Sequence, residues 1–149
     1  MGNEPELSPG NSGVQRKAEL LMIAWLGIEL SCNLEPKRIH LPNGGRLELD
    51  GYSEDPFVIC EAWAHQGPPK SAQKFKVMND AMKLITARRV IGVHARAVLL
   101  FADEGAANHL RGRSWQATAL AESHIEIMVA NLEDEVRAQI RNAQIRQYR

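Results

Sequence analysis

Three short extended runs follow one another between residues 37 and 63, and the connections between them constrain the fold most strongly. Residues 37–41 and 46–50 are separated by Pro-Asn-Gly-Gly, and Asn-Gly between two extended runs is a strong β-hairpin signal. A loop over residues 51–56 then leads to an apolar, β-rich run over 57–63, in which Phe57, Ile59, Glu61 and Trp63 are expected to point to one face of the strand and the residues between them to the other. Because parallel strands need a crossover of a dozen or more residues, these short connections predict an antiparallel three-stranded meander.

Helical patterns flank the meander. Residues 14–30 and 71–87 carry apolar residues at the spacing of a helix that packs one face on a core. In the second helix, four large apolar side chains share one face, which we expect to be buried: Phe75, Met78, Met82 and Ile85.

The rest of the chain predicts further alternation of strands and helices. The expected elements are a strand over 95–101, a helical region over 104–122 interrupted near Gly112, a strand over 125–129 and a helix over 132–149. Strands separated by helices require crossovers, so the later strands are expected to add in parallel. The element order α-β-β-β-α-β-α-β-α thus predicts an α/β (α+β) protein with a central mixed sheet flanked by helices.

The length and composition fit one ordinary domain. With 149 residues, of which 44% are hydrophobic and 24% charged, we expect a polar, disordered tail over 1–12 and a single domain over 13–149. No apolar run approaches the ~20 residues that a membrane span needs, and the first residues lack the pattern of a signal peptide. Two cysteines cannot build a disulfide scaffold. These features predict a cytoplasmic protein without a membrane contact.

Charge is balanced overall but unevenly distributed. Lys plus Arg and Asp plus Glu both number 18, so net charge does not indicate a strongly basic nucleic-acid binder. Residues 65–89, however, hold six Lys or Arg residues and one Asp, whereas acidic residues gather over 48–61. A basic segment of this kind attracts the phosphate backbone of nucleic acids without reading its sequence.

Two acidic residues stand out beside this basic segment. Asp50 ends one expected strand, and Glu61 lies within the next strand, in an otherwise apolar run. Adjacent strand ends lie side by side, and two carboxylates held close together need a cation or a raised pKa. Oxygen ligation with open positions suits Mg²⁺. Two alternatives stay open: Asp50 before Gly51 is also typical of a turn, and Glu61 could be a structural carboxylate paired with a lysine.

The runs RLELDG and CEAWAHQG, followed by the basic helix, resemble the core of the PD-(D/E)XK nuclease superfamily, which has the restriction-endonuclease-like fold. That core is a helix, a three-stranded meander, a helix and a strand, here over about 14–101 and followed by a C-terminal α-β-α extension. The resemblance implies that Asp50 and Glu61 bind Mg²⁺ (or Mn²⁺) together with the backbone carbonyl of Ala62. It also implies that an acid of the first helix joins them, for which Glu19 is best placed.

The sequence departs from this family at one position. The family's lysine, two residues after the second acid, is replaced by Trp63. In some members of the superfamily this lysine lies on the following helix. There we favour Lys76, which shares a polar stripe of the helix with Gln73, Asp80 and Lys83, and Lys74 is a second catalytic candidate. Lys70, at the entry of the helix, is a further option, and if none of the three serves, His65 is the next candidate.

The resemblance implies a Mg²⁺-dependent nuclease that hydrolyses phosphodiesters in nucleic acid, DNA rather than RNA, and that works as a homodimer. Six side chains of the basic segment are expected to contact the nucleic acid: Lys70, Gln73, Lys74, Lys83, Arg88 and Arg89. Two alternatives follow from the replacement of the family's lysine by Trp63 and from the low specificity of a motif that consists of one Asp and one Glu. One is an inactive member of the fold that serves as a nucleic-acid-binding or protein-interaction module, and the other is an unrelated α/β protein whose acids are structural.

Overall fold

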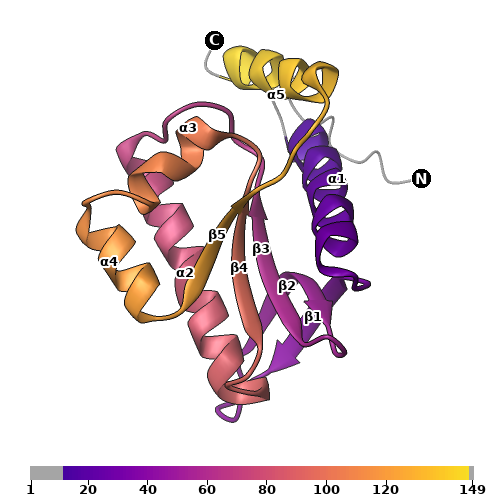
Figure 1. Ribbon diagram of the computed structural model, residues 1–149, viewed down its shortest axis with the longest axis vertical. Coiled ribbons are helices and arrows are strands. Elements are labelled where there is room, and N and C mark those ends of the chain that lie inside the picture. Colours follow the sequence, from indigo (N-terminus) through magenta and orange to yellow (C-terminus); the bar gives the residue numbers. More distant parts are fainter. Residues whose placement is uncertain (1–11, 148–149) are drawn as a thin grey trace.

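The computed structural model describes residues 12–147 and contains one five-stranded sheet with helices on both faces (Figure 1). The tail expected over 1–12 lies outside the described residues, except for Ser12, which begins the first helix. The elements in chain order are α1 (Ser12–Leu30), β1 (Glu35–His40), β2 (Arg46–Ser53), β3 (Val58–Trp63), α2 (Ser71–Ile91), β4 (Arg96–Phe101), α3 (Glu104–Ala107), a 3₁₀ turn η1 (Asn108–Leu110), α4 (Trp115–Glu122), β5 (Ile125–Val129) and α5 (Asp134–Gln147). None of these helices is long and apolar enough to cross a membrane.

The sheet has the order β1-β2-β3-β4-β5. The first three strands pair antiparallel, while β4 and β5 add in parallel to β3 and to each other. The expected meander, the parallel later strands and the mixed α/β class are therefore confirmed. Gly44, at φ +87°, lies in the tight turn between β1 and β2, where its missing Cβ permits this backbone conformation.

Two apolar layers cover the sheet (Figure 1). On one face, α2, α3 and α4 pack against residues such as Ile59 and Trp63 of β3. On the other face, α1 and α5 pack against Val58 and Cys60. The alternation along β3 that the sequence predicted is thus confirmed, and it places Glu61 on the face that α2 covers.

The core-facing side of α2 differs from the prediction. The buried residues are Val77, Ala81, Leu84 and Ala87, whereas the side chain of Phe75 is 76% exposed. Met82 is exposed as well, while Met78 and Ile85 are only partly buried. Apolar residues occur all around this helix, and the small alanines let its backbone approach the sheet closely. The largest side chains therefore do not mark the buried face.

Strands β2 and β3 separate at Asp50. They pair only from Gly51↔Cys60 to Ser53↔Val58, and the pairing of β1 with β2 skips one residue of β2 in the same region. Leu49 packs on the α2 side, whereas a Cβ on Gly51 would lie 2.5 Å from the sulfur of Cys60 on the α1 side. Residues two apart in a strand normally point to the same face of the sheet. Leu49 and Gly51 point to opposite faces because of the bulge between them. We call the gap between the β1–β2 hairpin and the last residues of β3 the fork.

Candidate functional site

Asp50 lies at the fork and replaces a missing backbone partner. Its Oδ2 accepts a hydrogen bond of 2.9 Å from the backbone N–H of Ala62, at a point where β2 no longer runs beside β3. Buried backbone donors are almost always paired. The Asp50 side chain therefore closes the sheet edge that the bulge opens, and its second oxygen stays available to other groups of the fork.

Glu61 is buried beside Asp50. Its side chain is only 2% exposed, and its Oε1 forms an ion pair with Nζ of Lys83 from α2. Among the described residues this oxygen accepts no hydrogen bond of regular geometry. Burial raises the pKa of Glu61 to about 9, as do its hydrogen bond to Asp50 and the charge of Asp50, while Lys83 acts in the opposite direction.

Two further acids complete the cluster. Burial raises the pKa of Glu19, on α1, to about 7, and the charge of Asp50 adds to the shift. Burial also raises the pKa of Asp80, on α2, to about 6. Four elements thus direct Glu19, Asp50, Glu61 and Asp80 to one fork, where negative charge is in surplus. A site of this kind stabilises a bound cation.

The lysine that reaches the acids is Lys83, which the sequence analysis placed among the phosphate contacts. Burial alone would lower its pKa, but the ion pair with Glu61 raises the pKa above its usual value. Lys76 is exposed two turns earlier on the same stripe, and its charge lowers the pKa of Glu19 and of Asp80. The stripe of α2 that faces the fork was thus predicted, but not the position along the helix at which a lysine contacts the acids.

The other predicted nucleic-acid contacts do not gather at the fork. Lys74 lies near His109, where it adds to the effect of burial in lowering the pKa of that imidazole. Arg88 donates hydrogen bonds to the backbone carbonyls of Ser123 and His124, so it holds the end of α4. Arg89 is exposed near the same end of α2.

Lys70 and Gln73 belong to the start of α2. The side chain of Gln73 accepts a hydrogen bond of 2.8 Å from the backbone N–H of Lys70, which caps the helix. Nε2 of Gln73 also lies 3.5 Å from Nδ1 of His65. Both residues therefore have roles in the local structure of this turn.

Trp63, at the position of the family's lysine, belongs to the core. Its ring packs edge-on against Phe101 at 6.0 Å and stacks on His65 at 4.9 Å between centroids. Burial lowers the pKa of His65, which favours the neutral imidazole. A lysine at position 63 would place its charge in this apolar layer, so the cation near Glu61 has to come from another element.

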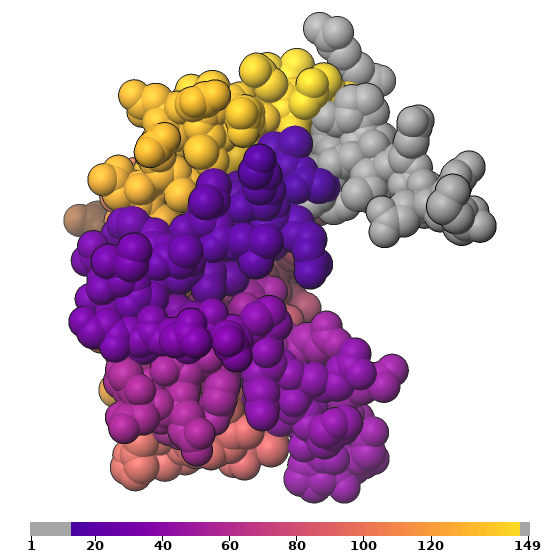
Figure 2. All heavy atoms as spheres, turned by 90° about the vertical axis from the view of Figure 1, so that its right-hand side faces the viewer, coloured from indigo at the N-terminus to yellow at the C-terminus, as the bar shows by residue number. Residues whose placement is uncertain are grey.

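A cleft of about 330 Å³ between α1 and the β1–β2 hairpin opens onto two of the four acids, Glu19 and Asp50. Figure 2, which looks onto α1, shows a recess between the indigo start of this helix and the purple hairpin below it. Glu19 and Asp50 are half-buried residues of the lining, while Arg16, Lys37 and Arg38 are exposed residues of its rim. The site is thus accessible to a ligand from the α1 side.

The donor set fits a hard divalent cation with few protein ligands. Within residues 12–147, no group of three or more His, Cys, Asp or Glu side chains is arranged so that it could hold a metal ion. Mg²⁺ is typically held by one or two carboxylates, with water and substrate phosphate in the remaining positions. Asp50 and Glu61 supply such a pair. The N–H and C=O of one residue in an extended strand point to the same side, so the carbonyl of Ala62 is directed at the fork like its N–H.

Comparison with protein-family models, with curated proteins and with solved structures found no match to this chain. The function of the fork is therefore inferred from its own chemistry. That chemistry is a surplus of carboxylates with raised pKa values, one lysine in contact with them and an open approach from the solvent.

Proposed function

We propose that this protein is a Mg²⁺-dependent nuclease that hydrolyses phosphodiester bonds of nucleic acid at the fork. The observation that carries the proposal is that Asp50 on β2 lies beside Glu61 on β3 and close to Glu19 on α1, and that Asp50 and Glu19 line an accessible cleft. Their mutual repulsion is relieved when a divalent cation replaces the protons that they otherwise hold.

The arrangement of the elements also supports a restriction-endonuclease-like fold. A helix, an antiparallel meander, a second helix and a parallel strand follow one another from α1 to β4, and β5 with its neighbouring helices extends this core. The location of Asp50 on β2 and of Glu61 on β3, within the meander, supports the resemblance to PD-(D/E)XK nucleases. DNA as the preferred substrate and assembly as a homodimer come from the resemblance alone and stay predictions.

Each residue of the fork has a distinct role in this proposal. Asp50, Glu61 and the carbonyl of Ala62 would bind Mg²⁺, and Glu19 would bind through water or directly. A bound Mg²⁺ acts as a Lewis acid and lowers the pKa of a coordinated water. Lys83, held beside Glu61, places a positive charge where negative charge develops on the phosphate, and takes the role first expected for Lys76 or Lys74.

Cleavage of labelled single-stranded and duplex DNA in Mg²⁺, Mn²⁺ and EDTA tests the proposal. We expect activity in either metal and none in EDTA. Asp50→Asn and Glu61→Gln should each abolish it, while Glu54→Gln, which changes an exposed acid of the β2–β3 turn, should keep it. Equal cleavage by wild type and Asp50→Asn would mean that the fork is not the active site.

One observation favours a second function, that of an inactive module with this fold. The ammonium group of Lys83 already pairs with Glu61, and so occupies part of the space that a cation would take. In that case Lys83→Met should create metal binding that wild type lacks. The melting temperature in Mn²⁺ separates the two functions, because a ligand of the native state must stabilise it. If the protein is a nuclease, Mn²⁺ raises the melting temperature of wild type. If it is an inactive module, Mn²⁺ raises the melting temperature of Lys83→Met only.

A further inference from the structure

The cleft above Asp50 continues along α1 as one groove whose two ends differ in chemistry. The charged residues that line the part toward the start of α1 are the cations Arg16, Lys37 and Arg38 and the acids Glu19, Glu48 and Asp50. The part toward the end of α1, of about 710 Å³, shares Leu20, Ile23, Pro36 and Asp50 with the first part and is otherwise mostly apolar. From Arg16 to Ile28 the helix extends about 18 Å, and Asp50 lines both parts.

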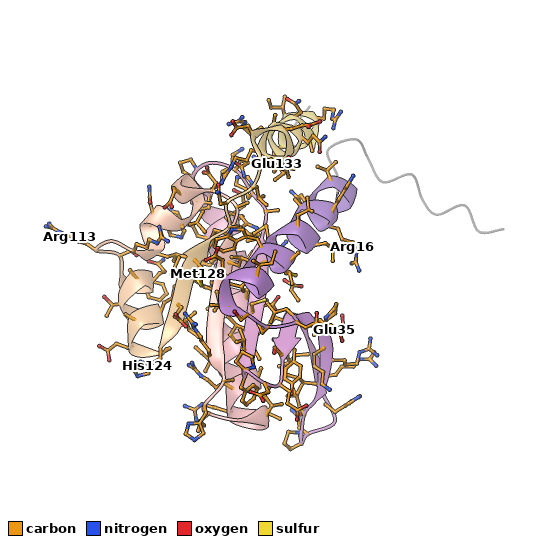
Figure 3. The ribbon with its side chains drawn as sticks, turned by 45° about the vertical axis from the view of Figure 1, so that its right-hand side comes forward. Arg16, Glu35, Arg113, His124, Met128 and Glu133 are labelled. Carbon is orange, nitrogen blue, oxygen red and sulfur yellow. The ribbon has the colours of Figure 1, made fainter. Side chains whose placement is uncertain are left out.

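The cations of the groove differ in their partners. Arg16 and Lys37 take part in no salt bridge within residues 12–147, whereas Arg38 neutralises Glu48 through two hydrogen bonds to one carboxylate oxygen. Nζ of Lys37 lies 5.3 Å from the centre of the Tyr52 ring, which keeps this side chain on the hairpin. In Figure 3, Arg16 extends from α1 on the side of the molecule where β1 begins at Glu35.

The apolar part of the groove presents an exposed aliphatic stripe of α1. Leu20, Ala24 and Ile28 follow one another at four-residue spacing on the exposed side of α1, and the side chain of Ile28 is 80% exposed. The faces of paired bases are stacked inside a duplex, so they cannot lie on such a surface. Unpaired bases can lie on this surface. Proteins that bind single strands combine a positively charged groove with aromatic side chains on which the bases stack, and here aliphatic side chains offer the bases an apolar contact.

We propose that this groove binds a single strand of nucleic acid, with phosphates at Arg16 and Lys37 and unpaired bases on Leu20, Ala24 and Ile28. This inference rests on the proposed function, since it leads the strand past Asp50. It moves the main contact surface from the exposed cations of α2 to the cleft between α1 and the hairpin. The substrate class is then a strand without a partner, such as a single-stranded end, flap or loop.

The test of the cations measures binding apart from cleavage. The affinity for a fluorescent oligothymidylate of about 15 nucleotides is read by anisotropy in EDTA. Two lost phosphate contacts lower the salt slope by about 1.4, which corresponds to about 25-fold weaker binding near 0.1 M salt. We expect this loss for Arg16→Gln/Lys37→Gln. The control Arg89→Gln/Arg113→Gln removes the same charge from exposed sites away from the groove and should leave the affinity within about twofold.

The test of the apolar part compares strand and duplex. Ile28→Gln should weaken binding of the single strand severalfold and leave the weaker duplex binding unchanged, whereas Ile145→Gln, an exposed apolar residue of α5, should change neither. Equal affinity of wild type for strand and duplex, no binding at all, or a larger loss in the Arg89→Gln/Arg113→Gln control would overturn the inference. So would a dimer that Ile28→Gln dissociates without loss of strand binding, since the stripe would then be a protein interface.

Cleavage in Mg²⁺ by the same variants separates this inference from the proposed function. If the protein cleaves in a metal-dependent way and the groove variants bind the strand as well as wild type, the groove inference is refuted and the proposed nuclease function stands. Strand binding that depends on the groove, without any metal-dependent cleavage, refutes the nuclease and keeps the groove as a binding site.

Discussion

Replacement of Asp50 by Asn should stabilise the metal-free protein at pH 8 and not at pH 5. The charge of Asp50 contributes to the raised pKa of Glu19, of Glu61 and of Asp80. Asn removes this charge but keeps an oxygen that can accept the hydrogen bond from the N–H of Ala62. The substitution therefore isolates the repulsion from the structural role.

The magnitude follows from Glu19, which ionises first above neutral pH. A rise of its pKa from 4.5 to about 7 corresponds to about 3.4 kcal/mol at pH 8, before solvent screening. Burial is the largest cause of the raised pKa of Glu19 and the charge of Asp50 is the second. We therefore expect Asp50→Asn to increase the free energy of unfolding by about 1 kcal/mol, or the melting temperature by roughly 2–4 °C.

The sign of the pH dependence is fixed by the direction of the shifts. A carboxyl whose pKa is raised on folding stabilises the native state below its unfolded pKa, and this contribution is lost as pH rises through the folded pKa. In wild type the loss runs from about pH 4.5 to 7 for Glu19 and on to about 9 for Glu61. At pH 5 both acids hold protons, and the charge of Asp50 then repels neither.

Urea unfolding followed by tryptophan fluorescence in EDTA, at pH 5 and pH 8, is the assay. Asp50→Ala, which also loses the acceptor for Ala62, should be about 1 kcal/mol less stable than Asp50→Asn at both pH values. Glu54→Gln should match wild type at both. An Asp50→Asn protein that is less stable than wild type at pH 8, or that gains equally at both pH values, would refute the repulsion argument and make Asp50 a structural acid.

Three further changes test other contacts of the fork. Lys83→Met should lower the single-turnover cleavage rate by about 10²–10³-fold, the size of one preorganised electrostatic group, with Lys83→Arg retaining more; an unchanged rate would return the role to Lys76. Mn²⁺ should raise the melting temperature more at pH 8 than at pH 6, because protons must leave Glu19 and Glu61 before metal binds; equal shifts would contradict ligation by these acids. Gly51→Ala should cost about 2 kcal/mol in urea unfolding, because the new Cβ would lie 2.5 Å from the sulfur of Cys60; added Cys60→Ala should recover most of this, and no recovery would locate the strain elsewhere.

Elements set by local rules could be predicted from the sequence. Asn-Gly in the turn before β2 specified the hairpin, and the period of two along β3 placed Glu61 and Trp63 on one face. The meander also predicted that Asp50 and Glu61 lie close together, but Asp50 does not end its strand as expected: it lies inside β2, and a bulge brings it beside β3.

Features set by long-range packing could not be predicted from the sequence. The buried face of α2 depends on how closely the helix approaches the sheet, and Ala81 and Ala87 allow a close approach that leaves Phe75 outside. The same packing decides that Lys83 rather than Lys76 meets Glu61. Residue spacing predicts which side chains share one side of a helix, but the place where the helix crosses the strand determines which turn of the helix contacts that strand.

The role of Arg88 shows the same limit for surface charges. In the sequence it is one cation of a basic segment, whereas in the structure its guanidinium holds the carbonyls at the end of α4. A sequence shows that a charge is present, but its partner is a backbone group more than thirty residues away and leaves no mark on the local pattern.

The hydrogen bond between Asp50 and the N–H of Ala62 makes one backbone amide a reporter of the fork. In an ordinary sheet this proton would report only on its strand neighbour. Here its chemical shift and its hydrogen-exchange rate depend on a side-chain carboxylate, and so on whatever that carboxylate binds. A single cross-peak in an NMR spectrum therefore follows the state of the fork through titrations of pH, metal or oligonucleotide, in the intact wild-type chain and without any label at the site.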